Sequence, residues 1–353
     1  MKAPLFTVLI DTYNYGEFIE EAVSSVLAQD FPPAEREILV VDDGSTDDTQ
    51  ERLRKFGGAI RCLRKPNGGQ ASAFNYGFEH ARGEVIALLD SDDTWLPEKL
   101  GRVYEEFKRY PTAGMVYHRT HLWNGAEDIS EDGYFIPVSG NVPESRRALL
   151  QYPMVGTSCL AFKREALQKL LPVPESLRFQ ADAYLTALII FVAPVAAVTE
   201  FLGKYRLHGA NLFQTNGERD SCGQIERRMA VRDALLHEIQ IWLQLHGADL
   251  NSADMRAYLT QWVKSQERDG FALRTPSRWK YFRHLFDFPL TYREIMTPRH
   301  QAYSYIRAFA ALLLGYHHLH LLDDVRMKRK QVFASSVEKS LAPEKEKAFA
   351  AKG

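Results

Sequence analysis

The 353-residue chain has few cysteines, no excess of one charge and no long apolar run. Its three cysteines, Cys62, Cys159 and Cys222, leave at least one thiol unpaired and show none of the spacings of a metal site. Lys and Arg number 44 against 45 Asp and Glu, a balance that argues against nucleic acid as a primary partner. No run reaches the roughly 18 apolar residues that a membrane-crossing helix needs, which argues against a membrane channel.

The N-terminal residues lead at once into the apolar run Phe6–Ile10 and show no signal peptide. Together with the odd number of cysteines, this predicts reduced thiols and a cytoplasmic protein. A hydrophobic share of 45% is sufficient for a large core, and the chain length allows one domain of common size plus an appendage.

Apolar, β-rich runs alternate with amphipathic segments over the first ninety residues. The spacing predicts the order β-α-β-α-β-α-β, and such alternation is typical of a mostly parallel sheet with helices on both faces. We therefore expect an α/β, Rossmann-like fold whose ligands bind at the carboxyl ends of the strands. The predicted strands are Phe6–Ile10, Glu37–Val41, Ile60–Leu63 and Val85–Leu89.

Polar clusters follow three of these strands, around Tyr13, at Asp42-Asp43 and at Asp90-Ser91-Asp92-Asp93. The carboxyl ends of parallel strands meet at one edge of a sheet, so the clusters should converge. Successive strand side chains point to opposite faces, which places Asp90 and Asp92 on one side and Asp93 on the other. Two facing carboxylates repel each other unless a cation or a proton intervenes, and a divalent metal site is therefore expected. Asp42 is expected to cap its own turn.

Four segments, in this order and spacing, resemble glycosyltransferase family 2, whose GT-A fold enzymes move a sugar from a nucleotide-diphosphate donor. The resemblance is strong from Leu5 to Leu100 and looser from Thr157 to Asn211. It implies a GT-A type fold with a Mn²⁺ or Mg²⁺ cofactor and, as donor, most often a UDP- or dTDP-sugar. The segments are Val8–Asn14, Leu39–Asp47, Asn67–Gly69 with Asn75 and Gly77, and Ala81–Asp93.

The resemblance also implies roles for single residues. Tyr13 would stack on the nucleobase, Asp43 would accept a hydrogen bond from the base edge, and Asp90 would lie near the ribose. Asp92 would ligate the metal, with His208 as a second ligand, and Arg206 or His208 would reach the diphosphate. The donor-binding set is Thr12, Tyr13, Asp43, Asn67, Asp90 and Arg206.

The acceptor half contains the candidate base, Asp182. The family commonly opens a helix here with a Glu-Asp pair, of which this chain keeps the aspartate and has Ala181 instead of the glutamate. In an inverting transferase Asp182 would take the proton from the attacking hydroxyl of a saccharide or lipid-linked acceptor. Two further departures are Asp11, where the family often has proline or a small residue, and Phe74, where a basic side chain is frequent.

Three alternatives stay open. Val85–Thr94 also fits the opening of a haloacid-dehalogenase-type phosphatase, with Asp90 as nucleophile and Asp92 as acid, although Asp323-Asp324 is a faint later acidic pair. A nucleotidyltransferase would require a basic glycine-rich loop after the first strand, which is absent. Ala181 raises the third alternative, a nucleotide-sugar binding protein without catalysis.

A single sugar addition is favoured over processive synthesis. Gln224–Arg228 only faintly resembles the Gln-x-x-Arg-Trp signature of processive synthases, because Arg228 replaces the tryptophan. The predicted domain order is a catalytic domain over 1–215, with a nucleotide-sugar half (1–100) and an acceptor half (101–215), then a helical region over 216–334 and a disordered tail over 335–353.

The last predicted helix, Gln301–Leu322, is followed by the basic cluster Arg326–Lys330. This combination suits peripheral docking on an anionic membrane surface at the cytoplasmic face. The alternative is a helix that packs on the catalytic domain and ends in solvated charges.

Overall fold

The computed structural model describes residues 3–125, 128–130, 139–140, 156–208, 211, 222–256, 258–260, 278–291 and 298–314. The chain forms two compact units, Met1–Leu273 and Arg274–Gly353.

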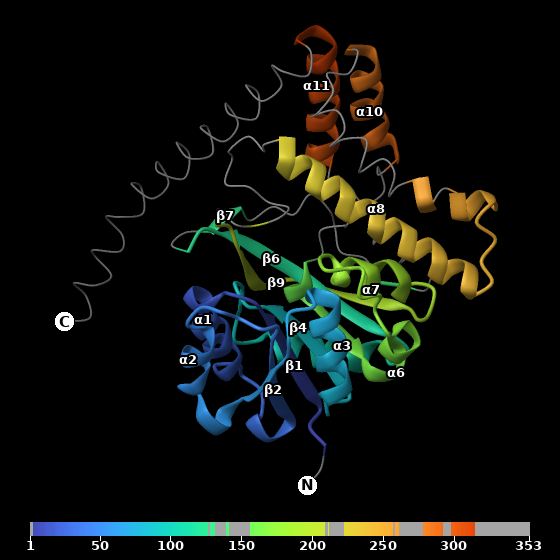
Figure 1. Ribbon diagram of the computed structural model, residues 1–353. Helices are drawn as coiled ribbons and strands as arrows, with labels where there is room; N and C mark the ends of the chain where they lie inside the picture. Colours follow the sequence, from blue (N-terminus) through green and yellow to red (C-terminus); the bar gives the residue numbers. More distant parts are fainter. Residues whose placement is uncertain are drawn as a thin grey trace, which may run out of the picture. The chain divides into compact units, whose positions relative to one another are not determined.

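The first unit begins with the predicted alternation of strands and helices, which the structure confirms (Figure 1). Further on, a 3-10 turn, Thr157–Cys159, precedes β8 (Leu160–Lys163), and a second 3-10 turn, Gln168–Leu170, follows α6 (Arg164–Leu167). In chain order the unit contains β1 (Phe6–Thr12), α1 (Gly16–Leu27), β2 (Arg36–Asp42), α2 (Thr49–Arg54), β3 (Arg61–Arg64), α3 (Gln70–His80), β4 (Val85–Asp90), β5 (Thr94–Trp95), α4 (Lys99–Arg109), β6 (Met115–Trp123), β7 (Asp128–Ser130), β8 (Leu160–Lys163), α6 (Arg164–Leu167), α7 (Ala181–Ile189), β9 (Val195–Arg206) and α8 (Cys222–Leu245).

The strands form one sheet in the order β3-β2-β1-β4-β8-β6-β9-β5, with β7 paired to β6. The four N-terminal strands are parallel, β8 runs antiparallel to both β4 and β6, and β6 and β9 are parallel. Thr12 pairs with Asp42, and Asp11 pairs with Asp90. The three polar clusters therefore start at the same edge of the sheet, as predicted.

Each face of the sheet is covered by its own apolar cluster. Leu9 and Leu88 pack under α3 and α7 with Phe74 and Leu185, whereas Ile10 and its neighbours pack under α1 and α4. Side chains alternate along β1, so Asp11 follows Leu9 onto the face that α3 and α7 cover.

Helices follow the sheet along the chain, as predicted for the C-terminal region. In the first unit α8 packs on α7, and the Tyr258 hydroxyl donates a hydrogen bond to the Ala187 carbonyl oxygen (2.8 Å). The second unit contains α10 (Arg278–Thr291) and α11 (Pro298–Leu314), which pack on each other through aromatic rings. The domain boundary at residue 215 stays a prediction.

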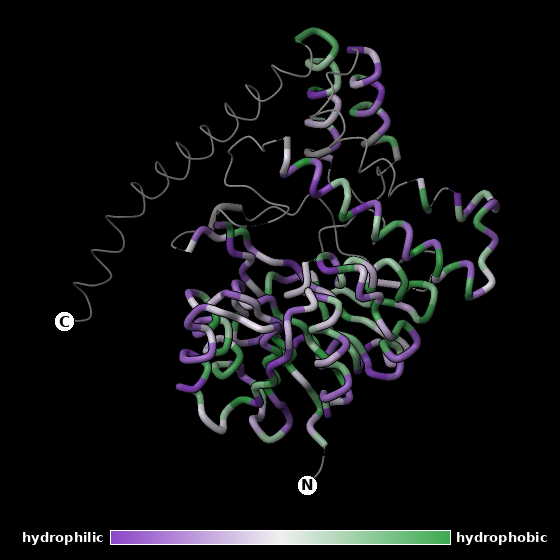
Figure 2. Tube along the Cα trace, viewed as in Figure 1, coloured by the Kyte–Doolittle hydropathy of each residue, from purple (hydrophilic) through white to green (hydrophobic). Residues whose placement is uncertain are grey.

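The predicted helix Gln301–Leu322 corresponds to α11 as far as Leu314. The basic cluster Arg326–Lys330, Asp323-Asp324 and the tail 335–353 lie outside the described residues. Hydrophobic and hydrophilic segments alternate along α10 and α11 (Figure 2). Among the residues that the structure describes, no helix is long and apolar enough to cross a membrane.

Candidate active site

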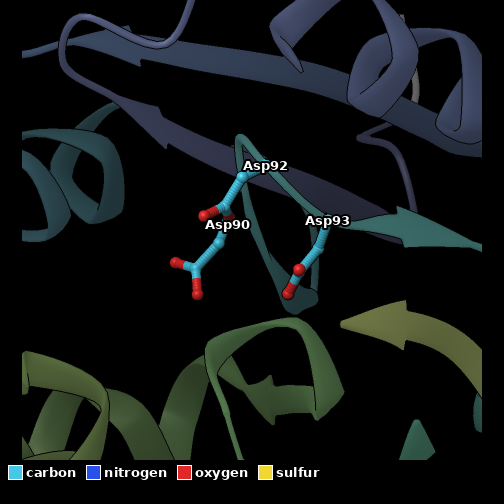
Figure 3. Close-up of side chains that lie close together, drawn as sticks. All are labelled: Asp90, Asp92 and Asp93. Carbon is cyan, nitrogen blue, oxygen red and sulfur yellow. The ribbon is translucent and has the colours of Figure 1, made fainter. Parts of the chain in front are cut away.

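The turn after β4 brings three carboxylates together. Oxygens of Asp90, Asp92 and Asp93 lie within 4.8 Å of one another. Figure 3 shows the carboxylates of Asp90 and Asp92 as neighbours and that of Asp93 on the other side of the turn, as the strand alternation predicted. Burial is the largest cause that raises the pKa of Asp90 and of Asp93 well above the ordinary value, and the neighbouring carboxylates add to it. Such a cluster is stabilised by a cation.

Asp93 holds the turn in place. Its Oδ2 accepts a hydrogen bond from the Ser158 hydroxyl (2.6 Å), and its Oδ1 accepts one from the backbone N–H of Arg206 (2.8 Å). The Ser158 hydroxyl oxygen also accepts the N–H of Asp90 (3.1 Å). With both Asp93 oxygens engaged within the chain, Asp90 and Asp92 are the carboxylates available to a ligand.

A buried lysine lies behind this turn. The Lys99 ammonium donates to the Ser158 carbonyl oxygen (2.9 Å) and lies 3.1 Å from the centroid of the Trp95 ring. Lys99 is fully buried, and this desolvation lowers its pKa well below the ordinary value, while the nearby Cys159 and Asp93 act in the opposite direction. Lys99 thus supports Ser158 from the core side through a hydrogen bond to its carbonyl oxygen.

His208 lies directly against the acidic turn. Its Nε2 is 2.9 Å from Oδ2 of Asp92, and its ring is stacked on Phe18 with 5.0 Å between the centroids. An edge contact with Tyr15 fixes the ring from a second side. His208 and Asp92, the two predicted metal ligands, therefore lie side by side, and the carboxylate of Asp92 suits Mn²⁺ or Mg²⁺.

Arg206 has its guanidinium group engaged within the chain. Nε donates to the carbonyl oxygen of Asp92 (2.8 Å), and Nη2 pairs with Glu21 of α1. The group also lies 4.1 Å from the centroid of the Trp123 ring. Arg206 therefore clamps the acidic turn between β9 and α1, and its contact with the donor diphosphate stays a prediction.

The loop after β1 presents Tyr13 to solvent, with 43% of its surface exposed. An aromatic side chain buried under the loop would show almost none, so the ring is free to stack on a base. Thr12 is buried, its hydroxyl has no hydrogen-bond partner within the described residues, and its carbonyl oxygen accepts the N–H of Asp43 (2.9 Å).

Asp43 organises the glycine turn between β3 and α3. Its carboxylate accepts the backbone N–H groups of Gly68 and Gly69 (2.9 and 2.7 Å) and pairs with the Lys65 ammonium (2.7 Å). Gly69 has φ +88°, and a Cβ there would lie 2.7 Å from the Cα of Arg178, so glycine is required.

Asn67 and Asp42 are also engaged in hydrogen bonds at this edge of the sheet. Asn67 accepts a hydrogen bond from Arg178 through its side-chain oxygen. Asp42 caps its turn by accepting the Ser45 N–H (2.8 Å), which confirms the structural role predicted for it. The contact of Asp43 with a base edge and the donor contact of Asn67 stay predictions.

Two further acids approach from β1 and α7. Asp182 lies in the first turn of α7 and is hydrogen-bonded by Thr157, and burial raises its pKa. Burial also raises the pKa of Asp11 to about 8, with a contribution from the negative charge of Asp182. One buried Asp11 oxygen has no hydrogen-bond partner within the described residues. Asp11, Asp90 and Asp182 thus converge from three separate elements.

A mixed sheet with an acidic turn and a histidine at its carboxyl edge defines a GT-A type protein, and two solved structures share this fold. TarS of S. aureus (1–349, in complex with UDP) matches with a TM-score of 0.59 and 19% identity over 88% of this chain and 92% of that one. Mannosyltransferase PcManGT of Pyrobaculum calidifontis, in complex with GDP-Man and Mn²⁺, matches with a TM-score of 0.51 and 20% identity over 89% and 88% of the two chains.

Sequence comparisons identify the family. Residues 7–171 match the model of glycosyl transferase family 2. An uncharacterized glycosyltransferase of Nostoc sp. is 34% identical over 58% of this chain and 65% of its own length. The hyaluronan synthase of Pasteurella multocida is 34% identical over a region that covers 44% of this chain and only 15% of that protein. Over residues 7–171 the chain therefore carries a glycosyl transferase family 2 domain, and this match sets the phosphatase and nucleotidyltransferase alternatives aside.

Proposed function

We propose that the chain transfers one sugar residue, with inversion, from a nucleoside-diphosphate sugar to an acceptor hydroxyl in a metal-dependent reaction. The observation that carries the proposal is the convergence of Asp90, Asp92 and His208 with Asp182 at one edge of the sheet. The phosphate groups of such a donor are anionic, and without a cation they would be repelled by these carboxylates.

Asp92 and His208 would hold Mn²⁺ or Mg²⁺, with Asp90 next to them. Hard oxygen ligands suit both ions, which need few protein ligands because they keep waters and take substrate oxygens. When bound, the ion would offset the charge that develops on the leaving nucleoside diphosphate. Lys99 and Arg206 keep the acidic turn in one conformation for this purpose.

Tyr13 would stack on the base, because its ring is exposed at the end of β1. The glycine turn that Asp43 holds would line the same side of the donor. Structural relatives were solved with UDP, UDP-GlcNAc and GDP-Man. We favour a uridine or thymidine diphosphate donor, and a saccharide or lipid-linked acceptor in polysaccharide or glycoconjugate synthesis.

Asp182 would act as the base. Burial raises its pKa, so its carboxylate is a better proton acceptor than an exposed one. The proton would pass from the acceptor hydroxyl to the Asp182 oxygen as the hydroxyl oxygen attacks the anomeric carbon and the bond to the diphosphate breaks. The cytoplasmic location expected from the cysteine content stays a prediction.

The test separates binding from transfer. Asp92→Asn should abolish Mn²⁺-dependent binding of the donor nucleotide in titration calorimetry, whereas Asp182→Asn should preserve binding and lose at least 100-fold in transfer or donor hydrolysis. Asp30→Asn, an exposed aspartate after α1, serves as the matched control. Unchanged metal-dependent binding in Asp92→Asn would refute the assignment of the metal site, and a fully active Asp182→Asn would refute that of the base. Wild-type protein that binds the donor without turnover would instead indicate a non-catalytic binding protein.

A further inference from the structure

Helix α11 has apolar side chains on two of its faces. Ala308 and Ala311 are fully buried within the second unit. Ile306, Phe309 and Leu313 are 59%, 53% and 73% exposed. Their spacing of three and four residues places them on one stripe of the helix surface.

Helix α10 extends this stripe. Trp279, 60% exposed, is stacked on Phe282 with 5.2 Å between the ring centroids, and Phe282 lies 5.5 Å from Phe309 of α11. The aromatic rings thus join the exposed residues of the two helices into one surface. We call this surface the hairpin patch; it consists of Trp279, Ile306, Phe309 and Leu313.

Positive charge lies on α10 beside the hairpin patch. Arg278, Lys280 and Arg283 are all exposed on α10. Nη1 of Arg278 donates a hydrogen bond to the carbonyl oxygen of Leu313 (3.0 Å), which places one cationic group at the end of the patch itself. Residues 278–291 and 298–314 contain five Lys or Arg and one acidic residue, a net charge of +4 in a chain whose total is −1.

We propose that the hairpin patch docks on an anionic lipid surface. Exposed Trp, Phe, Ile and Leu beside Lys and Arg are the composition of helices that lie in the plane of a membrane interface, with apolar side chains below the headgroups and cations at their level. A second copy of the chain is a poorer occupant, because two surfaces of the same positive sign would face each other. This docking is independent of the transfer reaction.

Vesicle flotation with the full chain tests the proposal. Wild-type protein is expected to float with phosphatidylcholine vesicles that contain phosphatidylglycerol and to remain behind with phosphatidylcholine alone. Ile306→Glu and Leu313→Glu should each reduce binding by about tenfold or more, since each places a carboxylate among apolar contacts. Leu245→Glu is the matched control, because Leu245 is 79% exposed at the end of α8 in the first unit. Arg283→Glu should also weaken binding, and added salt should mimic its effect.

Four results would overturn the proposal, the last of them a loss of stability in a variant. The first is wild-type protein that binds neither kind of vesicle. The second is equal loss of binding in Leu245→Glu. The third is a wild-type dimer in sedimentation that Ile306→Glu converts to monomer, which would assign the patch to a second copy. Thermal unfolding of the variants should match wild type, and a large loss of stability in Ile306→Glu would show that the patch is covered within the chain.

Discussion

Asp11 is a carboxylic acid where the family often has proline or a small residue, and its burial costs free energy of folding. It places a carboxyl group at the end of β1, where burial and the nearby Asp182 and Asp92 raise its pKa to about 8. One of its oxygens is buried without a hydrogen-bond partner within the described residues. An ionised carboxylate is costly in such a position, because it has lost water without gaining a donor.

The stability of the metal-free protein should therefore depend on pH through Asp11. The folded state holds a proton between about pH 4 and pH 8 that the unfolded chain has released, so stability falls as the pH rises through this window. Asp11→Asn has no such proton to lose, and its advantage over wild type should grow from pH 5 to pH 8, to about 1–3 kcal/mol. Thermal unfolding in the presence of a chelator measures this difference. A constant difference across that range would refute the shifted pKa of Asp11.

Some residue-level contacts could be predicted from the sequence and others could not. His208 was expected at the metal site and lies 2.9 Å from Asp92. The partner of Arg206 was not expected, because Glu21 precedes it by 185 residues and belongs to another element. Ser158 was missed as well, since a serine in an apolar run gives no signal of the two aspartates that it bridges.

At the scale of elements, the acidic turn is a loop held from three sides. The 3-10 turn before β8 contributes Ser158, β9 contributes the N–H of Arg206, and α4 contributes Lys99. Ser158 and the Arg206 N–H bond the turn directly, whereas Lys99 acts on it through the Ser158 carbonyl oxygen. The turn is therefore preorganised by elements that follow it in the chain.

Ser158→Ala tests this preorganisation. Loss of the hydroxyl removes one hydrogen bond from Asp93 and one from the N–H of Asp90, so the variant should lose about 1–3 kcal/mol of stability. It should also bind Mn²⁺ more weakly in the presence of nucleotide, because the turn is freer to move. Thr186→Val, another buried hydroxyl, is the control, since its oxygen bonds only within α7. Unchanged Mn²⁺ affinity in Ser158→Ala would limit Ser158 to a structural role.

The N-terminal elements could be predicted well because their periodicity is local. β1, β2 and β4 are short runs with apolar cores bounded by turn residues, and the sequence contains that information directly. β3 is less apolar, and it was predicted at Ile60–Leu63 but spans Arg61–Arg64. The twelve-residue strand β9 was not expected. Its first four residues are buried, but exposed, intermediate and buried positions then alternate irregularly, and its register with β6 shifts twice. Long-range pairing of this kind leaves no regular pattern in one sequence.

At the scale of the whole molecule, the chain combines a family 2 domain, matched over residues 7–171, with C-terminal helices that follow the matched residues. The helical character after residue 215 could be predicted, but α10 was missed, because Pro289 and dense aromatic residues obscure its helical pattern. The apolar stripe of α11 was anticipated in part, and its exposure could be learned only from the fold.

The proposed metal dependence concerns the entire donor site, and removal of the metal should test it. A chelator should abolish nucleotide binding and transfer, and Mn²⁺ or Mg²⁺ should restore both, since Asp90 and Asp92 would otherwise repel the diphosphate. Calorimetric titration of a nucleoside diphosphate with and without chelator measures this effect. Equal affinity under both conditions would show that the acidic turn does not act through a cation.

Thermal unfolding of the wild-type chain is the most direct test of the central claim, with uridine, thymidine, guanosine, cytidine and adenosine diphosphates, each with and without Mn²⁺. A nucleotide at about 100 times its Kd should add roughly 2.7 kcal/mol of stability. We expect such stabilisation from uridine or thymidine diphosphate, and only when Mn²⁺ is present. No response to any of the five, or a response that is the same without metal, would contradict the account.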